Sequence, residues 1–557
     1  MSREEDPRGL GATHDVVNQP PPFEDVNLLE LDAALCEGLS REGAASFADD
    51  VRDFGATLGS AQAFSLGRDA NRFTPELRTH DRFGHRLDEV TFHPAWHELL
   101  RLGMAARVHN LPWHARRPGA HVARSALLSL LSQVESGSCC PLTMTFACLP
   151  ALRHQKEVAE EWEPLLLGTV YDPHLSPPRK KSAVLIGMAM TEKQGGSDVR
   201  ANSTRAHPLS AGGSGEEYTL IGHKWFCSAP MSDAFLTLAQ AERGLSCFLV
   251  PRILPDGARN PFQIQRLKDK LGNRSNASSE IEFRGTLARM VGEEGRGVRT
   301  ILEMVHHTRL DCVSGSAGLM RQALSQALHH ARHRSAFGRR LVEQPLMEAV
   351  LADLALESEA ATALMLRLAR AYDEAPASEP ERAFARLATA VAKYWVCKRA
   401  PTMIAEAMEC LGGNGYVEES GLPRLFREAP VNAIWEGSGN VICLDVLRAI
   451  VREPSSLPAF LDELRLARGG NRALDAYATG LEREIADPTD SEARARGLVE
   501  RMALALQGSL LVRGAPSFVA DAFCEARIQR EGGLLFGALP AGAKRREIVM
   551  RALPAVV

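Results

Sequence analysis

The spacing of hydrophobic and polar positions changes along this chain and divides it into regions. From residue 31 to 180, apolar side chains recur every three or four residues, as in "HVARSALLSLLSQVESG". That spacing gathers them on one face of an α-helix, so it predicts an N-terminal helical domain. Residues 1–30, which include "QPPPFEDV", are polar and Pro-rich, and we expect them to form an extended arm.

Between residues 181 and 292 the pattern becomes that of short strands. Runs such as "EYTLIGHKWF" and "LSCFLVPR" alternate with turn residues. This texture is typical of a compact β-domain, and we predict a barrel or sandwich.

Helical spacing returns over residues 293–452 and predicts a helical bundle domain. The apolar residues of 298–305 fall at relative positions 0, 3, 4 and 7. Further helices are expected at 316–334, 343–370 and 380–410. Residues 453–557 are again mostly helical, and we predict an additional C-terminal domain there. The fold class is therefore α+β, in the order helical, β, helical.

Composition narrows the class of protein. A chain of 557 residues is too long for a single core. The net charge of −4 excludes a generally basic nucleic-acid coat. Eleven scattered cysteines indicate a reducing compartment, not a disulfide framework. No apolar run reaches about 18 residues, and "MSREEDPRGL" is not a signal peptide. We predict a cytoplasmic protein without a membrane segment.

Candidate chemistry is concentrated in three distant segments. No GxGxxG or GxxxxGK[ST] nucleotide fingerprint occurs. Instead, "MTEKQGGSD" precedes "GHKWFCS" by about thirty residues, "RHRSAFG" follows at 332–338, and "CLGGNGY" and "AIWEGSGN" lie within 410–440. Taken alone, the first segment is an ordinary turn whose glycines allow close approach of the backbone.

Together these segments resemble the acyl-CoA dehydrogenase superfamily, whose helical–β–helical order matches residues 31–450. Other stretches, such as "THDVVNQPPPFEDVNLLELDAAL", "GSCCPLTMTFA" and "LPRLFREAPVNAIWEGSGN", resemble the AidB subgroup, flavoproteins of the bacterial response to DNA alkylation. The likeness extends over nearly the whole chain. It implies bound FAD, a homotetramer, and flavin sites shared between subunits.

The resemblance assigns the cofactor-binding residues. The "MTE..GGSD" loop would hold FAD through backbone and hydroxyl groups, and the tryptophan segment would line the isoalloxazine. Many members have threonine where this chain has Cys227, and a thiol is a weak donor. The first set is Met190, Thr191, Gly196, Ser197, Trp225, Phe226 and Ser228. A second set, in which Arg334 and Phe337 reach a neighbouring subunit's FAD, is Arg334, Phe337, Gly412, Gly413, Trp435, Gly437, Ser438 and Asn440.

Glu436 is the residue that the resemblance makes catalytic. In the family this glutamate removes the α-proton of an acyl thioester while hydride leaves the β-carbon for flavin N5. Some members carry the base on the helix that begins near residue 297, where this chain has Thr308 before Arg309. Taken alone, Glu436 could equally be a carboxylate at a helix entry.

The resemblance also implies that the C-terminal domain binds double-stranded DNA through phosphates. Residues 455–557 contain 14 Lys/Arg and 13 Asp/Glu, a balance of 14 − 13 = +1, so composition alone does not show this. A solvated Arg/Glu helix surface is the alternative. The candidate residues are Arg465, Arg468, Arg472, Arg494, Arg496, Arg501, Lys544, Arg545 and Arg546.

The sequence thus predicts a FAD flavoprotein that protects duplex DNA during alkylation stress, with at most slow acyl-CoA dehydrogenation. One alternative is an ordinary acyl-CoA dehydrogenase without a DNA role; the other is a DNA-binding protein with a structural flavin. The pairs His93/His97 and His329/His333 have a metal-compatible spacing, but no HExxH occurs, so we predict no metal.

Overall fold

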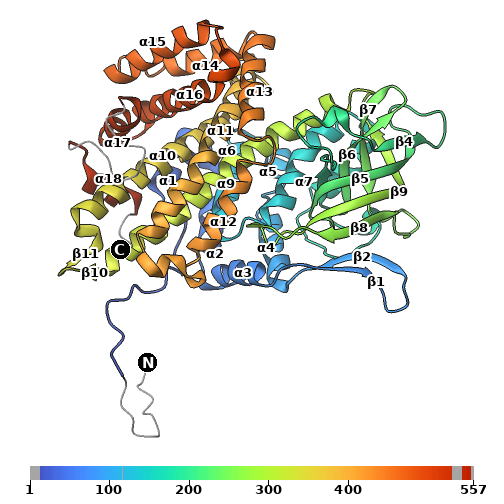
Figure 1. Cartoon of the computed structure of the whole chain (residues 1–557), viewed down its shortest axis with the longest axis horizontal. Coiled ribbons are helices and arrows are strands. Elements are labelled where there is room, and N and C mark those ends of the chain that lie inside the picture. The colour runs from blue at the N-terminus through green and yellow to red at the C-terminus, as the bar shows by residue number, and fades with distance from the viewer. Residues whose placement is uncertain (1–12, 116, 530–541, 554–557) are drawn as a thin grey trace.

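The computed structural model describes residues 13–115, 117–529 and 542–553 (Figure 1). Residues 1–12 of the predicted arm therefore lie outside the described residues. Within the described part of the chain, no helix is long and apolar enough to cross a membrane.

The N-terminal region is helical, as predicted, but it contains a β-hairpin that the helical interpretation missed. The alternating residues of 76–91 form two antiparallel strands. The hairpin contacts the barrel, because the Ile264 backbone N–H donates to the Asp88 carboxylate at 2.7 Å. The elements are α1(Ala33–Arg41), α2(Ala48–Leu58), α3(Ala61–Arg72), β1(Glu76–His80), β2(Arg86–Thr91), α4(Pro94–Ala105), α5(Leu111–Ala115), α6(Ala120–Val134), α7(Cys139–Leu152) and α8(Lys156–Leu166).

The β-domain, predicted as a barrel or a sandwich, is a barrel. Strands β6, β4, β5, β9 and β7 form a ring that closes because β7 also pairs with β6. Strand β3 pairs in parallel with β6, and β8 pairs with β9 in antiparallel orientation. The strands are β3(Ile186–Ala189), β4(Arg205–Pro208), β5(Glu217–Ser228), β6(Ala234–Ala241), β7(Gly244–Pro251), β8(Phe262–Leu267) and β9(Ser278–Val291).

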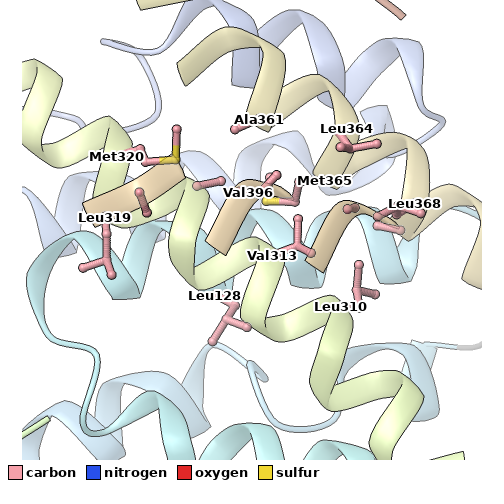
Figure 2. Packing of buried hydrophobic residues seen from close by; sticks show 14 of the residues in the cluster. Leu128, Leu310, Val313, Leu319, Met320, Ala361, Leu364, Met365, Leu368 and Val396 are labelled. Carbon is pink, nitrogen blue, oxygen red and sulfur yellow. The ribbon is translucent and has the colours of Figure 1, made fainter. Parts of the chain in front are cut away.

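The central helical bundle begins with one continuous helix where the sequence predicted two. Small residues between the two predicted segments are packing positions: a Cβ added at Gly318 would come within 2.3 Å of the Ser129 carbonyl oxygen. Leucine, valine and methionine side chains of α6, α9, α10 and α11 form its core (Figure 2). The helices are α9(Gly297–His333), α10(Pro345–Glu374), α11(Glu379–Glu409), α12(Leu422–Asn432) and α13(Gly439–Arg452).

The C-terminal helices pack against this bundle through buried ion pairs. Arg367 on α10 is 2% exposed and binds Glu463 at 2.7 Å and Glu381 at 2.9 Å. Arg527 similarly binds Asp353 and Glu357 on α10. The helices are α14(Ser456–Arg465), α15(Arg472–Ala486), α16(Ser491–Gly514), α17(Ser517–Phe523) and α18(Arg545–Ala552).

Candidate cofactor and active site

The loop that follows β3 is fixed to β5 by a buried charge. Glu192, which is 0% exposed, accepts from the Lys224 ammonium at 2.8 Å and from the backbone N–H groups of Ser203 and Thr204. Beside it, the backbone N–H of Trp225 donates to the Thr191 carbonyl at 2.8 Å. The predicted cofactor loop and the tryptophan segment therefore lie side by side.

The two glycines of this loop are required by its geometry. Gly195 has φ +146°, which favours glycine, and a Cβ added at Gly196 would come within 2.4 Å of the Thr191 hydroxyl. Gly196 and Ser197 are exposed, whereas Met190 and Thr191 are partly buried. The loop thus presents backbone and hydroxyl groups to the outside, where a ligand could bind them.

The tryptophan segment forms an aromatic platform at a bulge of β5. The pairing of β5 with β9 shifts register between Lys224 and Cys227, and Phe226 is left 50% exposed. The Lys268 ammonium lies 3.3 Å from the Trp225 ring centroid, a cation–π contact. Lys268 also lies 4.8 Å from the Phe226 ring centroid, so the platform offers apolar surface with a cation against it.

Cys227 does not share that exposed surface. Its side chain is completely buried, and burial raises the pKa of the thiol to about 12. The Ser228 hydroxyl remains partly exposed and lies 3.2 Å from the Ser278 hydroxyl. Of these two neighbours, Ser228 is the one that can donate to a ligand on the platform.

Glu436 occupies a constrained turn between α12 and α13. Its φ of +57° lies in the left-handed region, which is uncommon for glutamate. Lys393, which is 1% exposed, donates to the Trp435 carbonyl at 2.9 Å and also to the Gly437 carbonyl. Arg309 donates to the intervening Glu436 carbonyl at 3.0 Å. Two cations thus hold three consecutive carbonyls of the turn. No motif in the sequence pointed to Lys393.

The Glu436 carboxyl is electrostatically tuned. The Thr308 hydroxyl donates to its Oε2 at 2.6 Å. Burial raises the pKa of Glu436, and the Thr308 hydrogen bond and the charges of Arg309 and Lys393 counter that only in part. A carboxyl with a raised pKa is suited to accepting and returning a proton near neutral pH. Thr308 stands on α9, where some family members carry the base. In this chain it donates a hydrogen bond to Glu436.

The Glu436 turn and the cofactor loop pack against the same apolar cluster. Met190 and Trp435 both pack against a core that includes Phe146 of α7 and Met304 of α9. The Trp435 indole N–H has no hydrogen-bond partner among the described residues. An unused indole donor on the residue before Glu436 fits a site that is completed by a bound group.

Two residues of the second predicted set, Arg334 and Phe337, lie at a separate hairpin. Arg334 precedes the short hairpin β10(Ser335–Ala336)–β11(Arg339–Arg340) and Phe337 lies in its turn, at the end of the bundle away from the barrel (Figure 1). Phe337 is 100% exposed. The Arg334 guanidinium donates to the Asn18 carbonyl at 2.6 Å, so it also holds the N-terminal arm.

The remaining predicted cofactor residues are largely open to solvent. A Cβ added at Gly412 or Gly413 would meet no heavy atom within 4 Å. Gly437 is partly buried and has φ +111°, whereas Ser438 and Asn440 are exposed at the start of α13. These positions are accessible to a ligand or to a second copy of the chain.

Several predicted DNA-binding arginines already have partners. Arg465 is paired with Asp462 at 2.7 Å, and Arg501 with Glu484 at 2.6 Å. Arg468 and Arg546 are exposed and form no ion pair within the described residues. Arg494 is paired with Asp487 at 3.7 Å, and Lys544 with Glu547 at 3.6 Å. Arg545 is partly buried, and the Nη1 of Arg496 donates to the Asn440 side chain at 3.0 Å.

The histidine pairs have structural contacts. The His93 ring caps α4 by accepting from the Ala95 N–H at 3.2 Å, and the His97 ring lies 2.8 Å from the Tyr171 hydroxyl. The His329 ring hydrogen-bonds the Pro21 carbonyl. Within the described residues, no group of three His, Cys, Asp or Glu side chains could hold a metal ion.

The chain matches three family models in the order of its regions. Residues 18–173 match the adaptive response protein AidB N-terminal domain, residues 187–286 the acyl-CoA dehydrogenase middle domain, and residues 295–451 the acyl-CoA dehydrogenase C-terminal domain. The chain is 48% identical over 524 residues to AidB of Escherichia coli (strain K12), covering 94% of this chain and 96% of that one. The chain therefore belongs to the acyl-CoA dehydrogenase family, in its AidB branch.

Solved structures agree with this placement. Caenorhabditis elegans ACDH-11 in complex with C11-CoA superposes with a TM-score of 0.85, at 28% identity and with 95% of each chain covered. An acyl-CoA dehydrogenase from Bacillus anthracis complexed with FAD shares the fold, with a TM-score of 0.64 at 16% identity, covering 92% of this chain and 85% of that one. FAD is the cofactor of this family, and the aromatic platform, open loop and unused Trp435 donor fit it.

Proposed function

We propose that this protein is an AidB-like flavoprotein that binds FAD, accepts acyl-CoA thioesters, and binds duplex DNA to protect it during alkylation stress. The observation that carries the flavin site is the packing of the "MTE" loop and the Glu436 turn against one apolar cluster, with the Trp225 segment hydrogen-bonded to that loop. The alkylation role is supported by the AidB identity over nearly the whole chain.

In the proposed reaction, Glu436 removes a proton from the α-carbon of the thioester. Its carboxylate must be ionised to do so, and the Thr308 hydroxyl stabilises the ionised form. Arg309 and Lys393 hold the turn so that the carboxylate keeps its direction. Bound FAD would supply the hydride acceptor, held by the loop of Met190, Thr191, Gly196 and Ser197 and by the platform of Trp225, Phe226 and Ser228.

The assembly proposed is a homotetramer whose flavin sites are shared between subunits. Phe337 is included because it is fully exposed at the tip of the β10–β11 hairpin, where a neighbouring copy could reach it. Arg334, Gly412 and Gly413 would then contact the flavin of a neighbouring copy.

The test of the catalytic role replaces Glu436 with glutamine, which keeps the shape of the side chain but cannot accept the proton. Flavin reduction is followed by absorbance during anaerobic mixing with a series of acyl-CoAs. We expect a slow reduction in the parent that falls by about 10²–10⁴-fold in Glu436→Gln. Flavin content and DNA affinity should not change, because neither requires that charge. Equal reduction rates in parent and variant would show that Glu436 is not the base.

Duplex DNA is titrated in parallel to separate the alternatives. If phosphates are the contacts, affinity falls steeply with salt and depends little on base sequence. Salt-insensitive or absent binding, together with fast turnover, would favour an ordinary acyl-CoA dehydrogenase. DNA binding with no flavin reduction by any acyl-CoA would favour a structural flavin.

A further inference from the structure

Lys270, on the loop between β8 and β9, is a partly buried cation that forms no ion pair within the described residues. Its ammonium donates to two neutral oxygens, the Asn276 carbonyl at 2.6 Å and the Ser278 hydroxyl at 3.0 Å. The nearby Lys268, by contrast, is paired with Glu280 at 2.6 Å. The charge of Lys270 is therefore hydrogen-bonded but not neutralised.

Two buried carboxyls lie near Lys270, but their oxygens are bound by other groups. Glu428 of α12 accepts from the backbone and side-chain N–H groups of Asn273 at 2.6 and 2.7 Å. Glu135, at the end of α6, accepts from the Ser275 hydroxyl at 2.7 Å. Burial lowers the pKa of Lys270, and the two carboxyls counter that only in part. An ammonium in this setting gains from a further negative charge close to it.

Hydrogen bonds connect Lys270 to Ser228, beside the aromatic platform. The Ser278 and Ser228 hydroxyls lie 3.2 Å apart, on residues that face each other across the β5–β9 pairing. A lysine ammonium is only a donor, so the Ser278 oxygen accepts from it and the Ser278 hydrogen is left for Ser228. The Ser228 oxygen then accepts, and its own hydrogen points outward, where Ser228 is partly exposed. One cation thus sets the direction of both hydroxyls.

We propose that Lys270 is a positioning residue for the flavin: it orients the Ser278 and Ser228 hydroxyls so that Ser228 donates to the bound ring, and its charge favours the reduced flavin. The inference rests on the proposed function, which places Ser228 at the flavin, and extends it to a cation outside the assigned site. Reduction adds electrons to the flavin, so a donor with a positive charge behind it holds the reduced form more tightly. A chain of hydrogen bonds polarises its members, so the charge acts at Ser228 from two hydrogen bonds away.

The experiment measures the midpoint potential of the bound flavin by spectroelectrochemistry in the full-length protein. Ser278→Ala breaks the chain of hydrogen bonds, and Lys270→Met removes its charge. Each change should move the equilibrium towards oxidised flavin about tenfold, which is about 30 mV towards negative potential for a two-electron couple. The double variant should move it no further than Lys270→Met alone, because both changes interrupt one chain.

Two other substitutions are the matched controls. Ser278→Thr keeps the hydroxyl and should keep the parent potential. Ser279→Ala removes the neighbouring hydroxyl, which donates to the Cys227 carbonyl at 2.9 Å and belongs to the other face of β9. It should also leave the potential unchanged. Thermal unfolding of the same samples separates a role in stability, which would lower the unfolding temperature without moving the potential.

Parent potentials in both Lys270→Met and Ser278→Ala would overturn the inference, and so would an equal shift in Ser279→Ala. A shift in Lys270→Met with none in Ser278→Ala would also overturn it, because the charge would then act without the hydroxyl chain. Should Lys270→Met fail to fold, Ser278→Ala against Ser278→Thr still decides. These outcomes leave FAD bound and the proposed function intact, whereas a parent protein that takes up no FAD would overturn the proposed function and the inference with it.

Discussion

At the scale of single residues, one hydroxyl hydrogen-bonds the Glu436 carboxyl and lowers its pKa. Thr308 donates to it at 2.6 Å and lowers a pKa that burial has raised. Thr308→Val removes this hydrogen bond, so the Glu436 pKa should rise further. Because the base must be ionised, the acid limb of flavin reduction against pH should move to higher pH.

Thr308→Ser is the matched control for this prediction, because it keeps the hydroxyl and should keep the parent pH profile. A profile that stays in place, or moves to lower pH, in Thr308→Val would contradict the assignment. Flavin content measured in the same samples separates this effect from loss of cofactor.

At the scale of elements, the cofactor loop depends on the buried Glu192–Lys224 pair beneath it. Lys224→Met leaves the Glu192 carboxylate buried without its counter-charge, a change that typically costs about 3–5 kcal/mol. Amide hydrogen exchange over residues 190–204 should therefore become faster. The double variant Glu192→Gln/Lys224→Met should recover part of the protection; no difference between single and double variants would show that the pair does not fix the loop.

The same pair predicts a pH dependence of the loop. Burial raises the pKa of Glu192, but Lys224 and the hydrogen bonds of residues 203–204 outweigh it and hold the pKa well below its usual value of 4.5. A carboxyl whose pKa is lowered by folding stabilises the folded state at pH values above its usual pKa. This stabilisation is lost as the pH falls through the folded-state pKa. Exchange at residues 190–204, corrected for its intrinsic pH dependence, should therefore show less protection in acid.

At the scale of the whole molecule, the hairpin tip tests the shared flavin site. Phe337→Ser removes the exposed ring, and FAD affinity or the oligomer mass by light scattering should fall if a neighbouring copy covers it. Phe83→Ser is the control, because that phenylalanine is 71% exposed at a different hairpin. Parent-like mass and FAD content in both variants would argue against the shared site.

The C-terminal helices should not be removable without damage to the rest of the molecule. Deletion after residue 455 takes away Glu463 and leaves Arg367, which is 2% exposed, with only part of its counter-charge. We expect the truncated protein to unfold at a lower temperature than the parent in a thermal scan. An unchanged transition would show that this region is independent. Exposed arginines such as Arg468 are better targets for the DNA test.

The sequence by itself determined the order of regions, the β-domain and the family, because these follow from local periodicity and short motifs. It also indicated Glu436, Trp225 and the glycine loop. It missed the β1–β2 hairpin and the continuity of α9, since glycine and serine at packing positions look like breaks. Only the tertiary structure decided that Lys393 holds the Glu436 turn, that Cys227 is buried away from the platform, and that Arg496 meets Asn440. These contacts join residues far apart in the chain, and no local pattern encodes which distant helices will pack together.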